Sequence, residues 1–409
     1  NNMMKPKIRF KGFEGEWKTS TIGEIAPLSG GYAFQSNHFS SVGIPIVRIS
    51  NILETGIVGG VFAKYATFDG DADFRLYDGD AVIAMSGATT GKVAIVHTQG
   101  FLYQNQRVGK FTKTDRVIYD FLTTIVKSHK FRADLSCLLT SSAQPNASSK
   151  DIDSITQSIP LDKDEQQAIG KYFTSLDSQI SASTSRLASL KQMKAASLQA
   201  MFPQEGETVP KIRFKGFEGE WKKVKLGDIA KFTKGQGYSK SDLKETGQPI
   251  ILYGRMYTKY QFVIDEVDTF ANLKDASILS EGDEIIMPAS GETPEDIACA
   301  SAVLAKDIIL GGDLNIMHFD LTKISTPYIA LVITYSKTHH DLSKCAQGKS
   351  VVHLHNGAIS RATISLPSLA EQQAIASYFT SLDRQISLQS QRLEKLKQIK
   401  SACLDKMFV

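Results

Sequence analysis

Cysteine, long apolar runs and secretion signals are scarce or missing in this chain of 409 residues. The four cysteines stand far apart, so the sequence indicates neither a paired zinc motif nor a disulfide framework. The opening residues NNMMKPKIRF lack the apolar core of a signal peptide. No apolar run reaches the roughly 18 residues that a membrane-spanning helix needs. We therefore expect a cytoplasmic protein that folds in a reducing compartment.

Catalytic motifs are missing as well. The sequence contains neither the [DN]PP[YF] tetrad of adenine methyltransferases nor the G-x-S-x-G nucleophile elbow. An ExK element occurs at residues 16–18 without the proline–aspartate pair of a nuclease core. The loop Ser86–Lys92 resembles a phosphate-binding loop, but it is one residue short between its glycines and Val93 replaces the magnesium-binding hydroxyl. We expect a chain without catalytic residues that binds no cofactor itself.

Charge of one sign is in slight excess only, because 47 basic residues oppose 43 acidic ones and leave a net charge of +4. Such a balance does not by itself indicate a nucleic-acid partner; local clusters have to do so. Residues 211–260 form one cluster, with twelve lysines and arginines against five acids. His353 and His355 lack a carboxylate or cysteine at ligand spacing, so we expect no metal there.

The sequence does contain a duplication. Residues 6–18 and 210–222 both read PKIRFKGFEGEWK. The stretches 165–196 and 371–402 agree at 21 of 32 positions, whereas the sequence between these matching ends differs strongly. Random drift after a duplication would scatter the changes evenly. Matching ends around different middles indicate one scaffold that carries two different recognition surfaces.

The matching ends 164–203 and 370–409 are predicted to be long helices. Their apolar residues recur at alternating steps of four and three, as in a coiled-coil seam. Ser183 and Gln389 occupy the same seam position and should weaken it locally. We expect the two helices to pair antiparallel within the chain. Two alternatives are that each helix packs on its own domain, or that the helices form a homodimer.

The middles, residues 1–163 and 204–369, contain short strand-like runs broken by glycine, aspartate and asparagine. We predict an α+β protein with two sheet-rich domains of mixed fold, separated by the two long antiparallel helices and related by a pseudo-two-fold axis. The expected strands are Ile44–Ile49, Ala81–Met85, Lys92–His97, Ile250–Tyr253, Glu284–Met287 and Ala298–Leu304, and the expected short helices are Ile118–Ser128 and Pro327–Lys337.

Polar and aromatic clusters in the loops suit a nucleic-acid partner. Arginine pairs well with guanine, and asparagine or glutamine with adenine, whereas lysine and serine suit phosphates. Taken one at a time, each of these residues could equally be a solvated loop side chain. The candidate contacts are Arg48, Asn51, Ser86, Thr89, Thr90, Lys92, Gln104, Asn105, Gln106, Arg107, Gln144 and Asn146 in the first copy, and Tyr253, Arg255, Tyr257, Lys259, Ser290, Gln347, Lys349 and His353 in the second.

These features, in this order and twice over, resemble the DNA-specificity subunit of type I restriction-modification systems. The resemblance covers essentially the whole chain. The motifs that carry it are both copies of FKGFEGEWK, the elements Ile22–Ile25 and Leu226–Ile229, the Gly-Asp pairs at Gly79 and Gly282, and the helix starts Glu165–Ile169 and Glu371–Ile375.

The resemblance implies a non-catalytic subunit that reads a bipartite, asymmetric site in double-stranded DNA. Its helices would set the gap between half-sites and dock two modification (methyltransferase) subunits, with restriction subunits joining the full complex. S-adenosylmethionine would then belong to the modification subunit. The acids Glu292, Glu295 and Asp296 depart from what a phosphate contact needs. The competing hypothesis is a non-enzymatic coiled-coil adaptor that binds other proteins.

Overall fold

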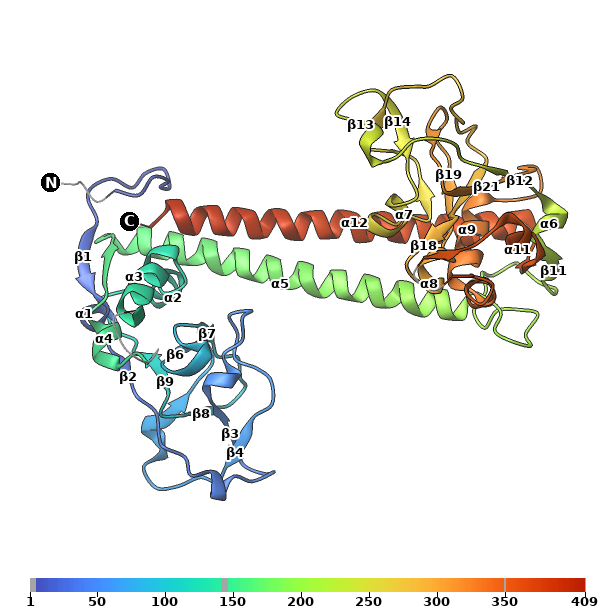
Figure 1. Cartoon of the computed structure of the whole chain (residues 1–409). Helices are drawn as coiled ribbons and strands as arrows, with labels where there is room; N and C mark the ends of the chain where they lie inside the picture. The colour runs from blue at the N-terminus through green and yellow to red at the C-terminus, as the bar shows by residue number, and fades with distance from the viewer. Residues whose placement is uncertain (1–4, 141–145, 349–350, 409) are drawn as a thin grey trace. The chain divides into compact units, whose positions relative to one another are not determined.

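Two helices of 38 residues each, α5 (Lys163–Ala200) and α12 (Leu369–Lys406), are the longest elements of the computed structural model (Figure 1). The structure describes residues 5–140, 146–348 and 351–408. The chain divides into two units: unit 1 comprises residues 1–184 and 391–409, and unit 2 comprises residues 185–390. Unit 1 therefore contains the start of α5 and the end of α12, and unit 2 contains the end of α5 and the start of α12.

Unit 1 combines two four-stranded sheets with short helices. The sheet β4-β3-β8-β5 lies at the end of the unit away from α2 and α3, and β2-β9-β6-β7 lies between (Figure 1). Its elements are β1 (Lys18–Thr21), α1 (Ile22–Ile25), β2 (Leu28–Ser29), η1 (Ser36–His38), β3 (Ile44–Val47), η2 (Ile49–Asn51), β4 (Ala63–Tyr65), η3 (Asp71–Phe74), β5 (Arg75–Leu76), β6 (Ala81–Ala84), η4 (Gly87–Thr89), β7 (Val93–Ile95), β8 (Leu102–Gln104), β9 (Val108–Phe111), α2 (Tyr119–Ile125), α3 (His129–Thr140), α4 (Ser149–Asp153) and β10 (Thr156–Ile159).

Unit 2 repeats this plan with a five-stranded sheet, β12-β21-β17-β19-β15, and a four-stranded sheet, β13-β16-β14-β20. Its elements are β11 (Lys222–Lys225), α6 (Leu226–Ile229), β12 (Ala230–Lys234), η5 (Lys240–Asp242), β13 (Leu243–Lys244), β14 (Gln248–Ile251), α7 (Arg255–Thr258), β15 (Val263–Ile264), β16 (Phe270–Ala271), β17 (Glu284–Pro288), β18 (Ser290–Gly291), α8 (Pro294–Ile297), β19 (Ser301–Val303), β20 (Ile309–Leu310), β21 (Leu314–Phe319), α9 (Thr326–Tyr335), α10 (Lys337–Ser343), β22 (Val352–His353), α11 (Asn356–Arg361) and β23 (Thr363–Leu366).

The strand order confirms that the two domains share one fold. The four-stranded sheet β2-β9-β6-β7 of unit 1 corresponds to the strands β12-β21-β17-β19 of the five-stranded sheet in unit 2. The parallel pair β3–β8 likewise corresponds to β14–β20. The α+β prediction is therefore confirmed. It missed the helix α3, and the run predicted as a strand at 298–304 forms one only at Ser301–Val303.

An arginine–glutamate ion pair joins the two matching ends within each copy. Arg9 donates from Nε and Nη2 to the two carboxylate oxygens of Glu165, both at 2.7 Å, and Arg213 does the same to Glu371 at 2.6 and 2.7 Å. The same guanidinium groups donate to the carbonyls of Gly15 and Gly219. Because the planar guanidinium matches the carboxylate at two points, the arginine of this segment and the glutamate of the helix start depend on each other in both copies.

The glutamine that follows each of these glutamates fixes the start of the helix to its own domain. Gln166 accepts from the Ile118 N–H at 2.8 Å and donates to the Pro160 carbonyl at 2.7 Å. Gln372 accepts from the Ser325 N–H at 2.9 Å and donates to the Pro367 carbonyl at 3.0 Å. Because both side chains are buried, their bonds must be replaced if either residue is changed.

The long helices run antiparallel in each unit. In unit 1 the start of α5 meets the end of α12, where Asp177 pairs with Lys400 at 2.5 Å and Tyr172 contacts Cys403 at 3.6 Å. In unit 2 the end of α5 meets the start of α12, where Lys194 pairs with Asp383 at 2.6 Å. The seam positions Ser183 and Gln389 are buried despite being polar. Intrachain antiparallel pairing is thus confirmed within each unit.

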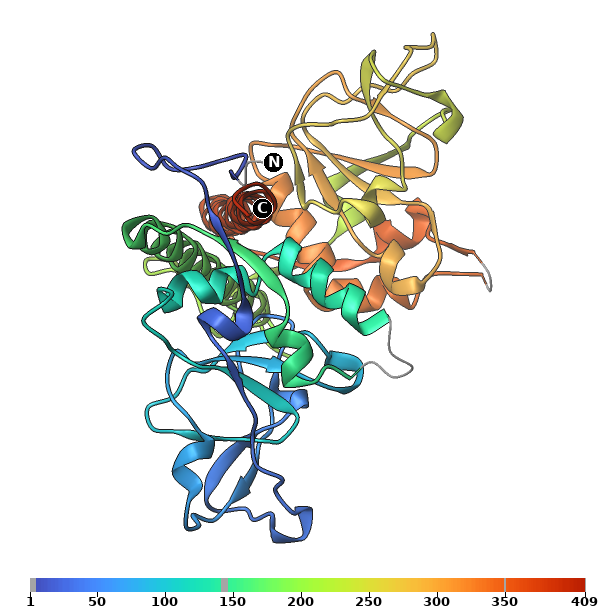
Figure 2. The same cartoon turned by 90° about the vertical axis from the view of Figure 1, so that its left-hand side faces the viewer.

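Each long helix ends in the core of the unit in which it did not begin. Phe408, after α12, packs against Trp17 and Phe121 of unit 1 with ring centroids 6.3 and 6.0 Å apart. Phe202, after α5, stacks on Phe379 of unit 2 at 6.2 Å. In unit 1 the Ile8 N–H also donates to the Lys406 carbonyl at 3.1 Å, which places the N-terminal segment beside the end of α12 (Figure 2).

Candidate nucleic-acid interface

Four loops of unit 1 meet beyond the end of β6. The Met85 N–H donates to the Arg107 carbonyl at 3.0 Å, and the Ala147 N–H donates to the Met85 carbonyl at 2.9 Å. The Thr89 hydroxyl donates to the Ile49 carbonyl at 3.4 Å. These bonds join loops that lie far apart in the sequence, residues 48–56, 86–92, 105–107 and 146–147. Most candidates of the first copy thus lie in one cluster, which we call the unit 1 tip.

The most exposed candidates of the unit 1 tip are Gln106, Arg107 and Asn146. Asn105 is half-buried, and its side-chain oxygen accepts from the Arg107 N–H at 3.3 Å. This bond shapes the turn between β8 and β9 and holds residues 106 and 107 at its outer edge. These side chains are therefore placed where a nucleic acid could reach them.

Four further candidates of the unit 1 tip are half-buried: Arg48, Thr89, Thr90 and Lys92. Arg48 lies over the Phe39 ring at 5.9 Å, and the Thr90 hydroxyl donates to the Gly87 carbonyl at 2.6 Å. Lys92 forms an ion pair with Glu54, which offsets its charge. A phosphate would have to compete with Glu54 for this ammonium group.

Asn51 and Gln104 correct the expectation that both contact bases. The Asn51 amide nitrogen donates to the carbonyls of Gly59 and Val61, both at 3.0 Å, and the side chain is 1% exposed. Gln104 is fully buried and donates to the carbonyls of Ser29 and Val108, both at 2.8 Å. Both amides hold the loops together and face away from solvent.

Ser86 is also buried, at 7% exposure, and its Oγ has no hydrogen-bond partner among the described residues. It is therefore not a surface contact in this conformation. Two other candidates, Gln144 and Lys349, lie outside the described residues.

The corresponding loops of unit 2 meet through the same backbone bonds. The Ala289 N–H donates to the Asp313 carbonyl at 2.7 Å, and the Leu354 N–H donates to the Ala289 carbonyl at 3.0 Å. Ala289 thus corresponds to Met85, and Asp313 to Arg107. We call this cluster, residues 252–259, 289–296, 311–313 and 347–354 as far as they are described, the unit 2 tip.

The basic candidates of the unit 2 tip are already paired. Arg255 donates to Asp268 at 2.6 Å, and Lys259 donates to the other oxygen of the same carboxylate at 2.5 Å. The hydrogen bond from Lys259, which contributes most, and the hydrogen bond from Arg255 hold the pKa of the Asp268 carboxyl group well below its usual range. The Arg255 side chain is only 8% exposed, which corrects the expectation of an exposed contact. Its guanidinium group instead joins residues of unit 2, because it donates to Asp268 and to Gln261.

The remaining candidates of the unit 2 tip are divided between surface and interior. Tyr253 is 39% exposed, and Gln347 and His353 are exposed while their backbones pair with each other. Tyr257 donates to the Ser290 carbonyl at 2.6 Å, and burial raises the pKa of its hydroxyl. Ser290 is buried at 7% exposure, so it too is no surface contact.

Sequence reasoning missed Asp313. Asp313 ends a Gly-Gly-Asp sequence, and such a sequence predicts the backbone geometry of a turn more strongly than a contact with DNA. Asp313 has a φ of 58°, is exposed and corresponds to Arg107. Only the alignment of the two backbones by their hydrogen bonds could have found it.

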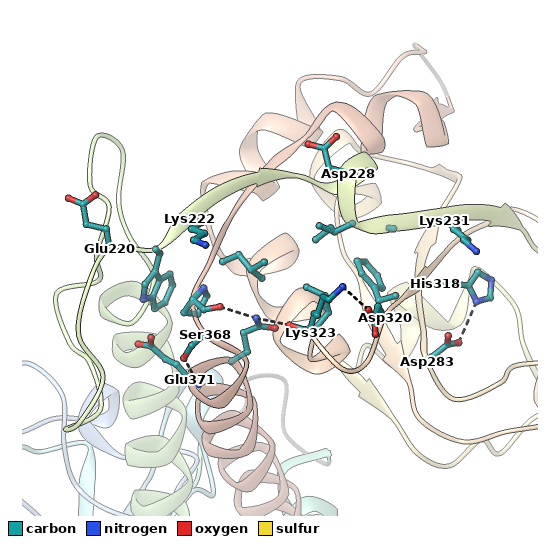
Figure 3. A pocket seen from close by; sticks show the side chains of 18 of the residues that line it. Glu220, Lys222, Asp228, Lys231, Asp283, His318, Asp320, Lys323, Ser368 and Glu371 are labelled. Atoms are coloured by element: carbon teal, nitrogen blue, oxygen red, sulfur yellow. Dashed lines mark hydrogen bonds and ion pairs between the residues drawn. The ribbon is translucent and has the colours of Figure 1, made fainter.

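Unit 2 also contains a polar cleft of about 1140 Å³ beside the start of α12 (Figure 3). Asp283 and His318 line this cleft, and together with the buried Glu284 they place their possible ligand atoms within 4.8 Å of one another. The Glu284 carboxylate already accepts the backbone N–H groups of residues 281–283, and His318 lies 3.4 Å from Asp283 (Figure 3). The backbone satisfies Glu284, and Asp283 pairs with His318, so hydrogen bonds within the chain account for the cluster.

Among the described residues, no helix is both long and apolar enough to cross a membrane. The long helices are amphipathic, with one buried stripe and exposed polar faces.

Comparison with known proteins agrees with the duplicated plan. The family model described as the type I restriction modification DNA specificity domain matches residues 14–192 and again residues 218–398. A crystal structure of a type I restriction-modification S subunit from M. genitalium superposes with a TM-score of 0.64 at 15% identity, covering 99% of both chains. The HsdS subunit from Thermoanaerobacter tengcongensis gives a TM-score of 0.44 at 16% identity over 96% of each chain. Among curated proteins, the sequence comparison finds no match.

Proposed function

The chain belongs to the type I restriction-modification DNA specificity family, and we propose that each of its two tips reads one half of a bipartite, asymmetric DNA target. It is a DNA-recognition subunit, and the adenine methylation or cleavage would be carried out by partner subunits. S-adenosylmethionine would be bound by the modification subunit. The observation that carries the proposal is that one backbone frame holds two loop clusters with different side chains.

We further propose that the long helices set the gap between the two half-sites. A helix of 38 residues is about 57 Å long at 1.5 Å per residue, which corresponds to about 17 base pairs at 3.4 Å each. Burial of the seam would hold the two helices together, because each fully buried leucine or phenylalanine contributes about 1.5–3 kcal/mol. The length of the paired helices would then set the gap.

The same helices offer a docking surface for two modification subunits, with restriction subunits completing the complex. Large apolar side chains are exposed on them: Leu388 at 57% and Met193 at 46% in unit 2, and Ile399 at 36% in unit 1. Exposed apolar groups on a helix that already buries its own seam suit a second protein surface.

Replacing Leu388 with glutamate tests this docking surface. A charge at the centre of an apolar contact should weaken binding of the modification subunit about tenfold, or about 1.4 kcal/mol. Leu321, 51% exposed in the turn before α9, provides the matched control, and Leu321→Glu should leave binding unchanged. Equal binding by both variants in a titration with the modification subunit would contradict docking at this face.

Reconstitution tests the function as a whole. The purified chain with S-adenosylmethionine should methylate no DNA, and addition of cognate modification subunits should give methylation at one bipartite sequence. Methylation by the chain alone would refute the proposal. A homodimer that binds no DNA even with modification subunits present would favour the adaptor hypothesis instead.

A further inference from the structure

The outer turns of the two tips hold equivalent residues of opposite charge. In unit 1 the Asn105 N–H donates to the Val47 carbonyl at 3.1 Å, and in unit 2 the Gly311 N–H donates to the Ile251 carbonyl at 2.9 Å. Two residues later, the carbonyls of Arg107 and Asp313 accept equivalent bonds from the N–H groups of Met85 and Ala289, the residues directly after β6 and β17. Backbone bonds on both sides therefore fix residue 107 and residue 313 at the same place in the fold.

Both side chains at this position are exposed and unpaired. Neither the Arg107 guanidinium nor the Asp313 carboxylate makes a hydrogen bond or ion pair with any residue that the structure describes. The described arginine and lysine of the unit 2 tip, Arg255 and Lys259, both pair with Asp268 and leave the Asp313 carboxylate without a cation there. A free charge at the outer edge of a rigid turn is available to a partner.

A carboxylate is a poor neighbour for DNA phosphates, since like charges repel. It suits a DNA surface only where a base presents a hydrogen-bond donor. In the major groove these donors are the amino groups of cytosine and adenine, whereas guanine presents acceptors that suit arginine. The exposed acids Glu292, Glu295 and Asp296 on the neighbouring loop of unit 2 add to the negative potential around Asp313.

We propose that Asp313 reads an exocyclic base amino group in the half-site of unit 2, at the position where Arg107 reads guanine in the half-site of unit 1. This inference rests on the proposed function. The same turn position would then determine base specificity in both copies. Arg107 would donate hydrogen bonds to its base, and Asp313 would accept one from its base.

The test uses the full chain with its modification subunits on a DNA library that is randomised in both half-sites. Asp313→Gly removes the carboxylate, and glycine adopts a φ of 58° without strain. Asp307→Gly is the matched control, because Asp307 is also an exposed aspartate with positive φ, at 61°, and it precedes β20 whereas Asp313 follows it. Sequencing of the methylated molecules gives the preference at each base.

Asp313→Gly should reduce the preference for cytosine or adenine at one position of one half-site by about tenfold or more, with the other half-site and the control unchanged. Asp313→Asn should shift that position towards adenine, because asparagine both donates to and accepts from adenine. Unchanged preferences, a lost preference for guanine or thymine, or an even loss over all sequences would each overturn the inference. If the wild-type complex showed no preference in either half-site, the proposed function itself would fail.

Discussion

Units 1 and 2 agree at the ion pair that joins each domain to its long helix, and they differ in the side chains of their tips. The pairs Arg9–Glu165 and Arg213–Glu371 have the same bonds to within 0.1 Å, and both glutamates are 1% exposed. At the tips, equivalent backbone bonds hold Arg107 in one unit and Asp313 in the other. The difference teaches that the frame resists change because its polar groups cannot be left unpaired in the interior. The tips can vary because water satisfies whatever side chain stands there.

The largest expected effect comes from the residues that close each core. Phe202→Ala and Phe408→Ala should each lower the free energy of unfolding by about 3–5 kcal/mol, with the larger loss for Phe202, which is 1% exposed against 9% for Phe408. Urea unfolding measures the loss, and hydrogen exchange shows which unit opens. Phe202→Ala should open unit 2 first. Leu273→Ala, 57% exposed, is the control and should change little. Opening of unit 1 first would show that the helix end does not belong to the core of unit 2.

The next effect concerns the matching ion pairs. Glu165→Gln and Glu371→Gln should each destabilise the protein by about 3 kcal/mol, because each leaves a partly buried guanidinium without its counter-charge. The two losses should be equal if the frame is the same in both units. Asp320→Asn, which breaks an exposed pair with Lys323, should destabilise the protein far less, because water screens the pair. Thermal unfolding measures both losses. A much larger loss of stability for one of the two variants would show that the two ion pairs are not equivalent.

Arg107→Gln tests whether the unit 1 tip reads a base. It should relax one base position in the half-site of unit 1 by about 1–3 kcal/mol and leave the other half-site unchanged. Methylation of a randomised library measures this. Arg116, exposed beyond the far end of β9 and bonded to the Glu24 carbonyl, provides the control Arg116→Gln. A uniform loss over all sequences would instead identify Arg107 as a phosphate contact.

The smallest effect depends on pH and is confined to the variable part of unit 2. Lys274 at 2.7 Å, with help from the Ser239 N–H, lowers the pKa of Asp242 from 3.8 to about 2. A carboxyl group whose pKa is lowered on folding adds stability above its unfolded pKa and loses it as the pH falls through the folded value. Asp242→Asn should therefore be less stable than wild type at pH 5, and the difference should close as the pH falls towards 2. Asp307→Asn, which removes a carboxylate without a described ion pair, is the control and should change the stability at pH 5 little in urea unfolding.

Residue type was a fair guide to where the tips lie and a poor guide to which side chains face outward. Asn51, Gln104 and Arg255 are the residue types that read bases, yet the structure uses each to brace a loop. Aspartate is a residue type that DNA-binding surfaces usually avoid, yet the Asp313 carboxylate is exposed and pairs with no described residue. Exposure of a loop side chain depends on which other loops pack beneath it, and no local pattern contains that information.

The sequence by itself determined the duplication, the two long helices and the sheet-rich domains between them. Repeats and hydrophobic periodicity are local signals, because residues three or four apart share one helix face and alternate residues share one sheet face. Only the tertiary structure decided that each helix ends in the core of the other unit, and that Arg107 and Asp313 are equivalent. Those facts rest on bonds between distant segments, such as Met85 with Arg107 and Ala289 with Asp313. The chain forms these bonds only when the whole sheet is in place.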